Sequence, residues 1–199
     1  MTALLLVALL TAAPAALPPE LAAIATQMKS VTTLQAHVRQ DKVLAVFAET
    51  MTSEGSLAFA RPRSLWLDFG GTDGTTLVVN GDAMALRYKA LARTERYSLS
   101  RDTRAKAIAE HIFLLLEADP AALATVYALT VTSKAPVAVQ LRPRAAALAA
   151  IITEIDAQFD GRGLVRRMVI HEAGGDLTRW TFTDVQTNVQ LPADRFALP

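Results

Sequence analysis

GSLAFARPRSLWLDF, residues 55–69, contains two runs in which large apolar residues occupy every second position, on either side of an Arg-Pro-Arg step. A period of two is typical of a β-strand. Because proline has no N–H and restricts φ, Pro62 predicts a bend between two antiparallel strands. The bend would place Arg61 and Arg63 beside the apolar face of a sheet. A permanently charged side chain in that position calls for a functional explanation.

The same alternation recurs along most of the chain. Short turn signals separate the alternating runs; Asn80-Gly81 is the strongest and Asp41-Lys42 a possible further one. We count roughly ten to twelve strand segments joined by turns of hairpin length, which predicts an antiparallel meander. A sheet of that many strands must curl. The predicted fold is therefore mainly β (α+β), a curled sheet with helices on its concave face.

Two segments have helical periodicity instead. Leu21, Ile24 and Met28 form one stripe of the segment 19–30, which begins with a proline. The segment 102–117 is the clearest helix, with Asp102 or Thr103 as its cap. Its apolar side consists of Ala105, Ile108, Ile112, Leu115 and Leu116, widened by Phe113 and Leu114. Helices with such faces can cover a large apolar interior.

Composition limits the classes of function. The 199 residues include 20 Lys and Arg against 19 Asp and Glu, and this net charge of +1 argues against binding to nucleic acid or to an anionic membrane. The absence of cysteine excludes disulfides, cysteine metal sites and thiol catalysis. With 52% hydrophobic residues, the chain can bury a sizeable core. Its length suits one domain, or one domain and a leader.

The segment Met1 to Ala16, MTALLLVALLTAAPAA, has the pattern of an export signal. Its short apolar run is followed by Ala13-Pro14-Ala15, which fits the small-x-small rule for cleavage. The run is too short to span a bilayer, which takes roughly 20 residues. A buried N-terminal helix is the alternative, but the prolines of this region disfavour a long one. We expect residues 1–15 to be a signal peptide and residues 16–199 to form a single mature domain.

Catalytic and metal-binding motifs are not apparent. The sequence has no nucleophile elbow and no phosphate-binding glycine loop. His37, His111 and His171 share no metal-ligand spacing, and His111 is interpreted as a helix-surface or lid residue. Glu154 and Asp156 are interpreted as part of a solvated outer face rather than as a general acid–base pair. The sequence thus predicts a protein that is not an enzyme and that uses no metal ion or cofactor.

The order of the parts resembles the LolA-like family of outer-membrane lipoprotein carrier proteins, which are periplasmic chaperones. The resemblance covers nearly the whole mature chain, and the order and spacing of individually weak motifs support it. The matching pieces are Arg39-Gln40, Gly55 to Phe59, Arg61-Pro62, Leu65 to Leu67, Leu77 to Gly81, Leu141 to Pro143, Ile155-Asp156, Gly161 and Thr181 to Phe196. Val38 stands where an aromatic residue is more common in the family.

The resemblance implies an unclosed antiparallel β-barrel, here of about eleven strands, with a helical lid over a hydrophobic cavity. It implies a monomeric periplasmic carrier of acylated lipoproteins or a related lipid. The carrier would receive its cargo from an ABC-type exporter of the inner membrane and pass it to an acceptor of the outer membrane. Arg61 matches the arginine of the family's Arg-Pro step, which is implied to hold the lid through hydrogen bonds to helix backbone and to release it on loading.

We expect large apolar side chains from both halves of the chain to bind the ligand. The candidates, besides Arg61, are Leu57, Phe59, Trp66, Leu86, Phe113, Leu116, Val139, Ile155 and Trp180. For each of them a place in a filled core is the alternative. The best-known carriers continue beyond the point matched by Phe196 with an extra strand and loop, whereas this sequence ends at Pro199. The departure raises the alternative of a specialised carrier, dedicated to another lipid or to the product of its own gene cluster.

Two other functions remain open on the same sequence. The first is a periplasmic sensor or regulatory module on the same fold, which would present an exposed apolar patch or a second domain to a partner protein. The second is a hydrolase with a lipid pocket, which requires a buried nucleophile–base pair.

Overall fold

The structure is a computed structural model that describes residues 18–46, 49–192 and 194–199; the predicted signal peptide, residues 1–15, lies outside them. The helices are α1 (Pro19–Lys29), α2 (Thr103–Glu117), α3 (Pro120–Val126) and α4 (Ala146–Ala149). The strands are β1 (Thr33–Leu44), β2 (Glu49–Ala60), β3 (Ser64–Phe69), β4 (Thr75–Asn80), β5 (Ala83–Tyr88), β6 (Arg93–Ser98), β7 (Tyr127–Lys134), β8 (Val137–Pro143), β9 (Ile152–Phe159), β10 (Val165–Glu172) and β11 (Leu177–Thr187). Among the described helices, none is long and apolar enough to cross a membrane.

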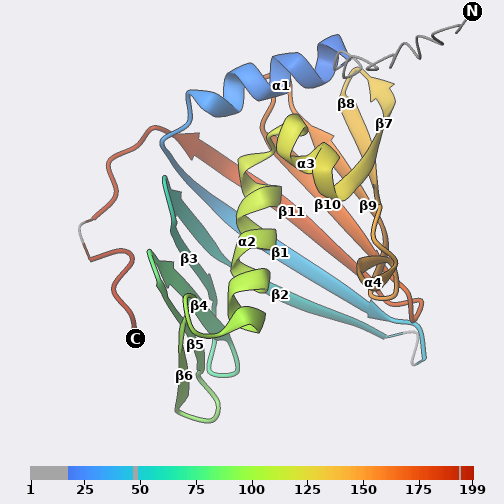
Figure 1. Cartoon of the computed structure of the whole chain (residues 1–199). Coiled ribbons are helices and arrows are strands. Elements are labelled where there is room, and N and C mark those ends of the chain that lie inside the picture. Colours follow the sequence, from blue (N-terminus) through green and yellow to red (C-terminus); the bar gives the residue numbers. More distant parts are fainter. Residues whose placement is uncertain (1–17, 47–48, 193) are drawn as a thin grey trace, which may run out of the picture.

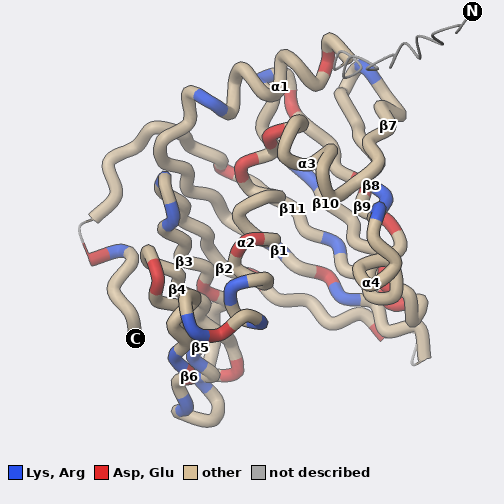
Figure 2. The backbone as a smooth tube through the Cα atoms, in the orientation of Figure 1, with Lys and Arg blue, Asp and Glu red and all other residues tan. Residues whose placement is uncertain are grey.

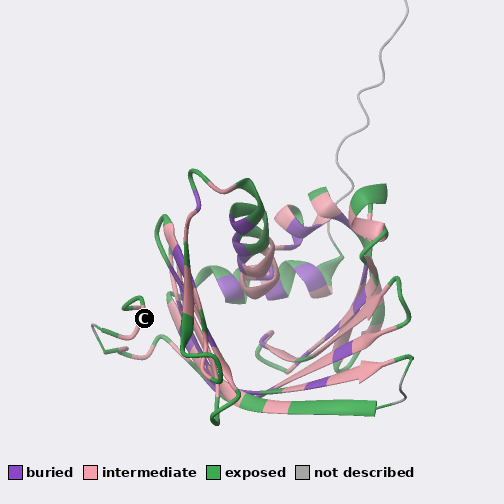
Figure 3. Cartoon of the chain, turned by 90° about the horizontal axis from the view of Figure 1, so that it is seen from below, coloured by how far each residue is buried: buried purple, intermediate pink, exposed green. Residues whose placement is uncertain are grey.

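The eleven strands of the described residues belong to one sheet in the order β6-β5-β4-β3-β2-β1-β11-β10-β9-β8-β7 (Figure 1). The first and last strands, β1 and β11, pair in its middle, where Val38 lies opposite Phe182. The sheet curls into a trough (Figure 3). It does not close into a barrel, because β6 and β7 form its two edges and do not pair with each other. The predicted curled, unclosed antiparallel sheet is confirmed.

The strand–bend–strand unit predicted at residues 55–69 forms the β2–β3 hairpin. Leu57 lies opposite Leu67, and Phe59 lies opposite Leu65. Phe59 and Leu65 are 1% and 0% exposed. The large apolar residues of both strands therefore share the concave face, which explains their period of two.

Helices α1, α2 and α3 lie over the concave side of the trough (Figures 1 and 3). As the capping pattern predicts, Asp102 accepts a hydrogen bond of 2.9 Å from the N–H of Ala105 at the start of α2. The buried stripe of α2 consists of Ala105, Ala109 and Phe113. Ile108 was expected on the apolar side but is 51% exposed, because it is rotated by about 100° from Ala109.

The predicted turn at Asp41-Lys42 is wrong, since both residues lie within β1. Asp41 is buried and accepts hydrogen bonds from Arg39 and from Thr52, which faces it on β2. These bonds satisfy the carboxylate inside the sheet and lower its pKa. Pairing between strands thus overrides the local preference of the Asp-Lys pair for a turn.

Charged residues of both signs occur along the described chain (Figure 2), in agreement with the near balance of 20 Lys and Arg against 19 Asp and Glu. Several Lys and Arg positions lie near β5 and β6, with Asp and Glu positions among them.

Gly55 marks a close approach of two backbones in the β2–β3 hairpin. A Cβ atom built on Gly55 would overlap the carbonyl oxygen of Asp68 on β3. A side chain at this position therefore requires the two strands to move apart.

We predict that Gly55→Ala lowers the free energy of unfolding by about 2 kcal/mol, because the added methyl group overpacks a rigid backbone contact. Urea denaturation measures the change. Gly161→Ala is the matched control, since a Cβ at Gly161 meets no atom within 4 Å. Equal stability of the two variants would contradict the role assigned to Gly55.

Candidate functional site

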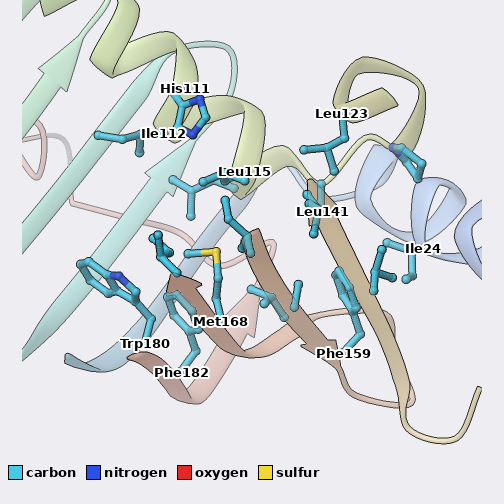
Figure 4. A pocket seen from close by; sticks show the side chains of 18 of the residues that line it. Ile24, His111, Ile112, Leu115, Leu123, Leu141, Phe159, Met168, Trp180 and Phe182 are labelled. Carbon is cyan, nitrogen blue, oxygen red and sulfur yellow. The ribbon is translucent and has the colours of Figure 1, made fainter. Parts of the chain in front are cut away.

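A cavity of about 360 Å³ lies between the concave face of the sheet and the helices (Figure 4). The residues that line it come from α1, α2, α3, the connection between α2 and α3, and strands on both sides of the trough. They are Leu21, Ile24, Leu57, Leu65, Leu67, Leu77, His111, Ile112, Leu115, Leu116, Ala118, Pro120, Leu123, Leu129, Val139, Leu141, Ile152, Ile155, Ala157, Phe159, Val165, Met168, Ile170, Trp180 and Phe182. His111 is the only titratable residue among them.

The size and the apolar wall of this cavity set it apart from ordinary packing. Protein interiors are close-packed and contain few voids larger than a water molecule. An engineered apolar cavity of roughly 150 Å³ already stays dry and binds benzene. The cavity described here is larger, so it can take a hydrocarbon ligand of several carbons.

Five of the predicted binding residues line the cavity. Leu57 lies on one side of the trough, Leu116 comes from the lid helix α2, and Val139, Ile155 and Trp180 lie on the other side. They are far apart in the sequence, and the curl of the sheet brings them around one space. Whether they bind a ligand remains a prediction.

Phe59 and Phe113 are not among the lining residues. Both are buried, and their ring centroids lie 6.1 Å apart. This contact packs α2 against β2 beside the cavity. For these two residues the structure agrees with the alternative of a filled core.

Trp66 does not line the cavity, contrary to the prediction. It alternates with the cavity-lining Leu65 and Leu67, so its side chain lies on the outer face of β3. There the guanidinium of Arg195 lies 4.8 Å from the Trp66 ring centroid. The C-terminal segment covers this tryptophan in place of the lid.

Leu86 takes an intermediate position. It lies opposite the cavity-lining Leu77 and shares its face of the sheet, yet it is not among the residues around the cavity. The alternation of apolar residues in β5 predicts correctly which face of the sheet Leu86 occupies. It does not predict how far along that face the cavity extends.

Arg61 lies at the β2–β3 bend and joins the C-terminal ends of two helices. Its Nε donates to the carbonyl of Val31 at 2.9 Å, and its Nη2 donates to the carbonyl of Met28 at 3.4 Å. Its Nη1 donates to the Glu117 carboxylate at 3.1 Å. One side chain therefore ties the end of α1 and the end of α2 to the sheet.

A second polar contact holds α2. Nε2 of His111 lies 2.8 Å from the hydroxyl oxygen of Tyr127, the first residue of β7. Burial lowers the pKa of His111 and raises the pKa of Tyr127 to about 12. Within the described chain, this contact and the Arg61–Glu117 pair are the side-chain hydrogen bonds that join α2 to the rest of the structure.

The sequence interpretation of His111 as a helix-surface or lid residue missed its place in the cavity wall. His111 and Leu115 are one turn apart and share a helix face. The spacing of four residues between His111 and the apolar Leu115 is the sequence signal that could have placed His111 in the cavity wall. A lone polar residue next to Ile112 does not show by itself which side of the helix it occupies.

Outside the cavity, Glu154, Asp156 and His171 form a cluster on the outer face of β9 and β10. Their possible ligand atoms lie within 4.8 Å of one another, although the sequence spacing did not indicate a cluster. His171 contacts Asp156 at 3.0 Å, and Arg142 donates to Glu154 at 2.8 Å. This partly exposed network is what a solvated sheet face provides.

Solved structures of low sequence identity are similar to this chain. The lipoprotein LppX of Mycobacterium tuberculosis has 12% identity and a TM-score of 0.50, with 87% of this chain and 96% of that chain covered. A DUF1329 family protein of Desulfovibrio piger has 10% identity and a TM-score of 0.48, with 89% and 95% covered. A LolA superfamily protein of Nitrosomonas europaea has 9% identity and a TM-score of 0.45, with 89% and 95% covered. At such identities, the likeness to LppX shows the fold alone.

The family comparison is more specific. Among curated proteins, none matches this chain. The family model described as "Outer membrane lipoprotein carrier protein LolA" matches residues 29–199. That range includes the sheet, the lid helix α2, the cavity wall from Leu57 onward, and Arg61. The resemblance inferred from the sequence is therefore confirmed, and this chain belongs to the LolA family of outer-membrane lipoprotein carrier proteins.

Proposed function

We propose that this protein is a periplasmic carrier that binds the acyl chains of lipoproteins, or of a related lipid, and moves them from the inner to the outer membrane. The observation that supports the proposal most directly is the apolar cavity of about 360 Å³ under a helical lid. Protein interiors are close-packed and unfilled apolar volume is destabilising, so an apolar space of this size favours a cavity kept for a ligand.

The contact between Arg61 and the lid helix is weak enough to be broken by an acyl ligand. The Arg61 and Glu117 side chains are 33% and 30% exposed, so their ion pair contributes about 1 kcal/mol or less. Burial of each CH₂ group gains about 0.8 kcal/mol. A few methylene groups therefore offset the ion pair that ties α2 to Arg61.

Family membership supports the rest of the proposal. The acylated cargo would come from an ABC-type exporter of the inner membrane and pass to an acceptor of the outer membrane. Export would use the signal peptide of residues 1–15, and residues 16–199 would act as a monomeric domain. The chain would work by binding alone, without a catalytic group, metal ion or cofactor.

The alternative of a sensor or regulatory module has less support from the described surface. An exposed apolar patch would favour it. Three of the large apolar side chains that are exposed are separate in the fold: Val46 follows β1, Leu91 lies between β5 and β6, and Ile108 lies on α2. The cavity, by contrast, brings apolar residues from both halves of the sheet and from three helices around one space.

We predict that Met168→Trp weakens binding of a fluorescent probe, a neutral fatty-acyl methyl ester, about tenfold, because the indole takes space that roughly two methylene groups would fill. Met168 lines the cavity from β10 (Figure 4). Val169→Trp is the matched control, since Val169 is the next residue of the same strand and is not a lining residue. Titration of the probe into each purified variant measures the effect. Equal affinities would refute the assignment of the cavity as the binding site.

We predict that Arg61→Leu keeps the fold and binds the probe but transfers it at least fivefold more slowly to acceptor vesicles. The reason is that the contacts of Arg61 with Val31, Met28 and Glu117 stabilise the closed, empty state. Without these contacts the closed, empty state is less stable, so release of the ligand is less favourable.

Arg63→Leu is the control for this transfer assay. Arg63 lies at the same bend with its guanidinium 5.9 Å from the Phe113 ring centroid, and in the described chain it forms no ion pair with either helix. Unchanged transfer by the Arg61 variant would rule out Arg61 as the lid switch.

A further inference from the structure

The imidazole of His111 is a hydrogen-bonding group in a cavity wall that is otherwise almost entirely apolar. Apart from the indole of Trp180, no other lining residue carries a side-chain N–H or O–H group. His111 belongs to α2, and its partner Tyr127 begins β7. An isolated polar group at such a place is costly unless it finds a partner, so its role needs an explanation.

The hydrogen bond to Tyr127 determines which nitrogen of His111 carries the proton. The Tyr127 side chain is 0% exposed, and within the described chain its hydroxyl has no other hydrogen-bond partner. If His111 donated, the Tyr127 hydrogen would be left buried without an acceptor. The favoured arrangement has the Tyr127 hydroxyl donating to Nε2 of a neutral His111, whose proton is then on Nδ1.

The Nδ1–H of His111 is consequently a hydrogen-bond donor that has no acceptor among the described residues. Because the His111 ring lines the cavity, a ligand there can supply the acceptor.

The cavity is polarised along its length. Figure 4 shows His111 and Trp180 toward one end, and Ile24 of α1 and Phe159 toward the other. The end beneath α1 is lined by purely apolar residues, such as Leu141. A ligand with one polar group and one hydrocarbon tail fits this gradient in a single orientation.

We propose that His111 is the subsite for the carbonyl oxygen of an acyl ester or amide, whose hydrocarbon tail extends toward α1, and that Tyr127 is its positioning residue. The proposal rests on the proposed function, because it assumes that the cavity holds an acyl ligand. It adds a chemical class: a neutral acyl derivative rather than a free fatty acid. A carboxylate would find no cationic residue in the lining.

The test compares two ligands of matched length, methyl laurate and dodecyl methyl ether, by displacement of the fluorescent fatty-acyl methyl ester used above. The ester offers a carbonyl and the ether does not. We expect the protein to prefer the ester about fivefold, the gain of one net hydrogen bond. His111→Phe should abolish the preference without weakening the ether. An unchanged preference in that variant would overturn the proposal.

Two control variants separate His111 from other groups. His37→Phe makes the same replacement on the outer face of β1, away from the cavity, and should keep both affinities. Trp180→Phe removes the other N–H of the lining and should keep the ester-to-ether ratio, whatever it does to both affinities. Loss of the ratio in Trp180→Phe alone would assign the subsite to the indole instead.

Spectroscopy gives readouts that a structural role of His111 would not move. With methyl laurate labelled with ¹³C at the carbonyl, binding should shift the carbonyl signal downfield, and His111→Phe should remove the shift. In ¹⁵N spectra the His111 ring should be a single Nδ1–H tautomer, and Tyr127→Phe should produce a mixture and reduce the ester preference. A bound ester without a carbonyl shift would overturn the subsite.

The outcomes also distinguish this proposal from the proposed function. If neither ligand displaces the probe or binds to the protein, the cavity is not an acyl site and both proposals fail. If both ligands bind equally well and His111→Phe changes neither affinity, the acyl cavity stands and the His111 subsite is refuted.

Discussion

The pairing of β1 with β11 is the contact on which the rest of the structure depends. It joins the first and last strands of the described chain in the middle of the sheet, so that two meanders become one sheet of eleven strands. A sheet of that width must curl, and its curl creates a concave apolar face too broad for one helix to fill. Helices α1, α2 and α3 cover this face without filling it, and the cavity is the space left between them.

Stability and function oppose each other in this arrangement. A filled core would be more stable, because every unfilled volume of apolar space forfeits contacts. The protein compensates beside the cavity, where Phe59 packs against Phe113 and Leu65 is fully buried. It retains only weak polar contacts between α2 and the sheet, at Arg61 and His111. Rigid packing on one side and a lightly held lid on the other are what a carrier that loads and unloads requires.

Much of the candidate site could be predicted from periodicity, and the failures have physical causes. Leu57 and Ile155 were placed correctly because alternation in a strand states which residues share a face. Trp66 was misassigned, although its position between Leu65 and Leu67 places it on the opposite face of β3. Its actual cover, Arg195, lies far along the chain in a segment without periodicity. His111 shares a helix face with Leu115, but that this face points into the cavity is set by the tertiary packing of α2.

The sequence by itself determined the strands, their inward faces, the capped helix and the family, because these depend on local periodicity and on the order of short motifs. Only the tertiary structure decided how wide the trough is, which apolar residues border empty space and which fill the core. It also decided that Arg61 meets Glu117 and that His111 meets Tyr127. These features depend on contacts between distant segments, and no local pattern encodes the volume left when a curled sheet and its helices come together.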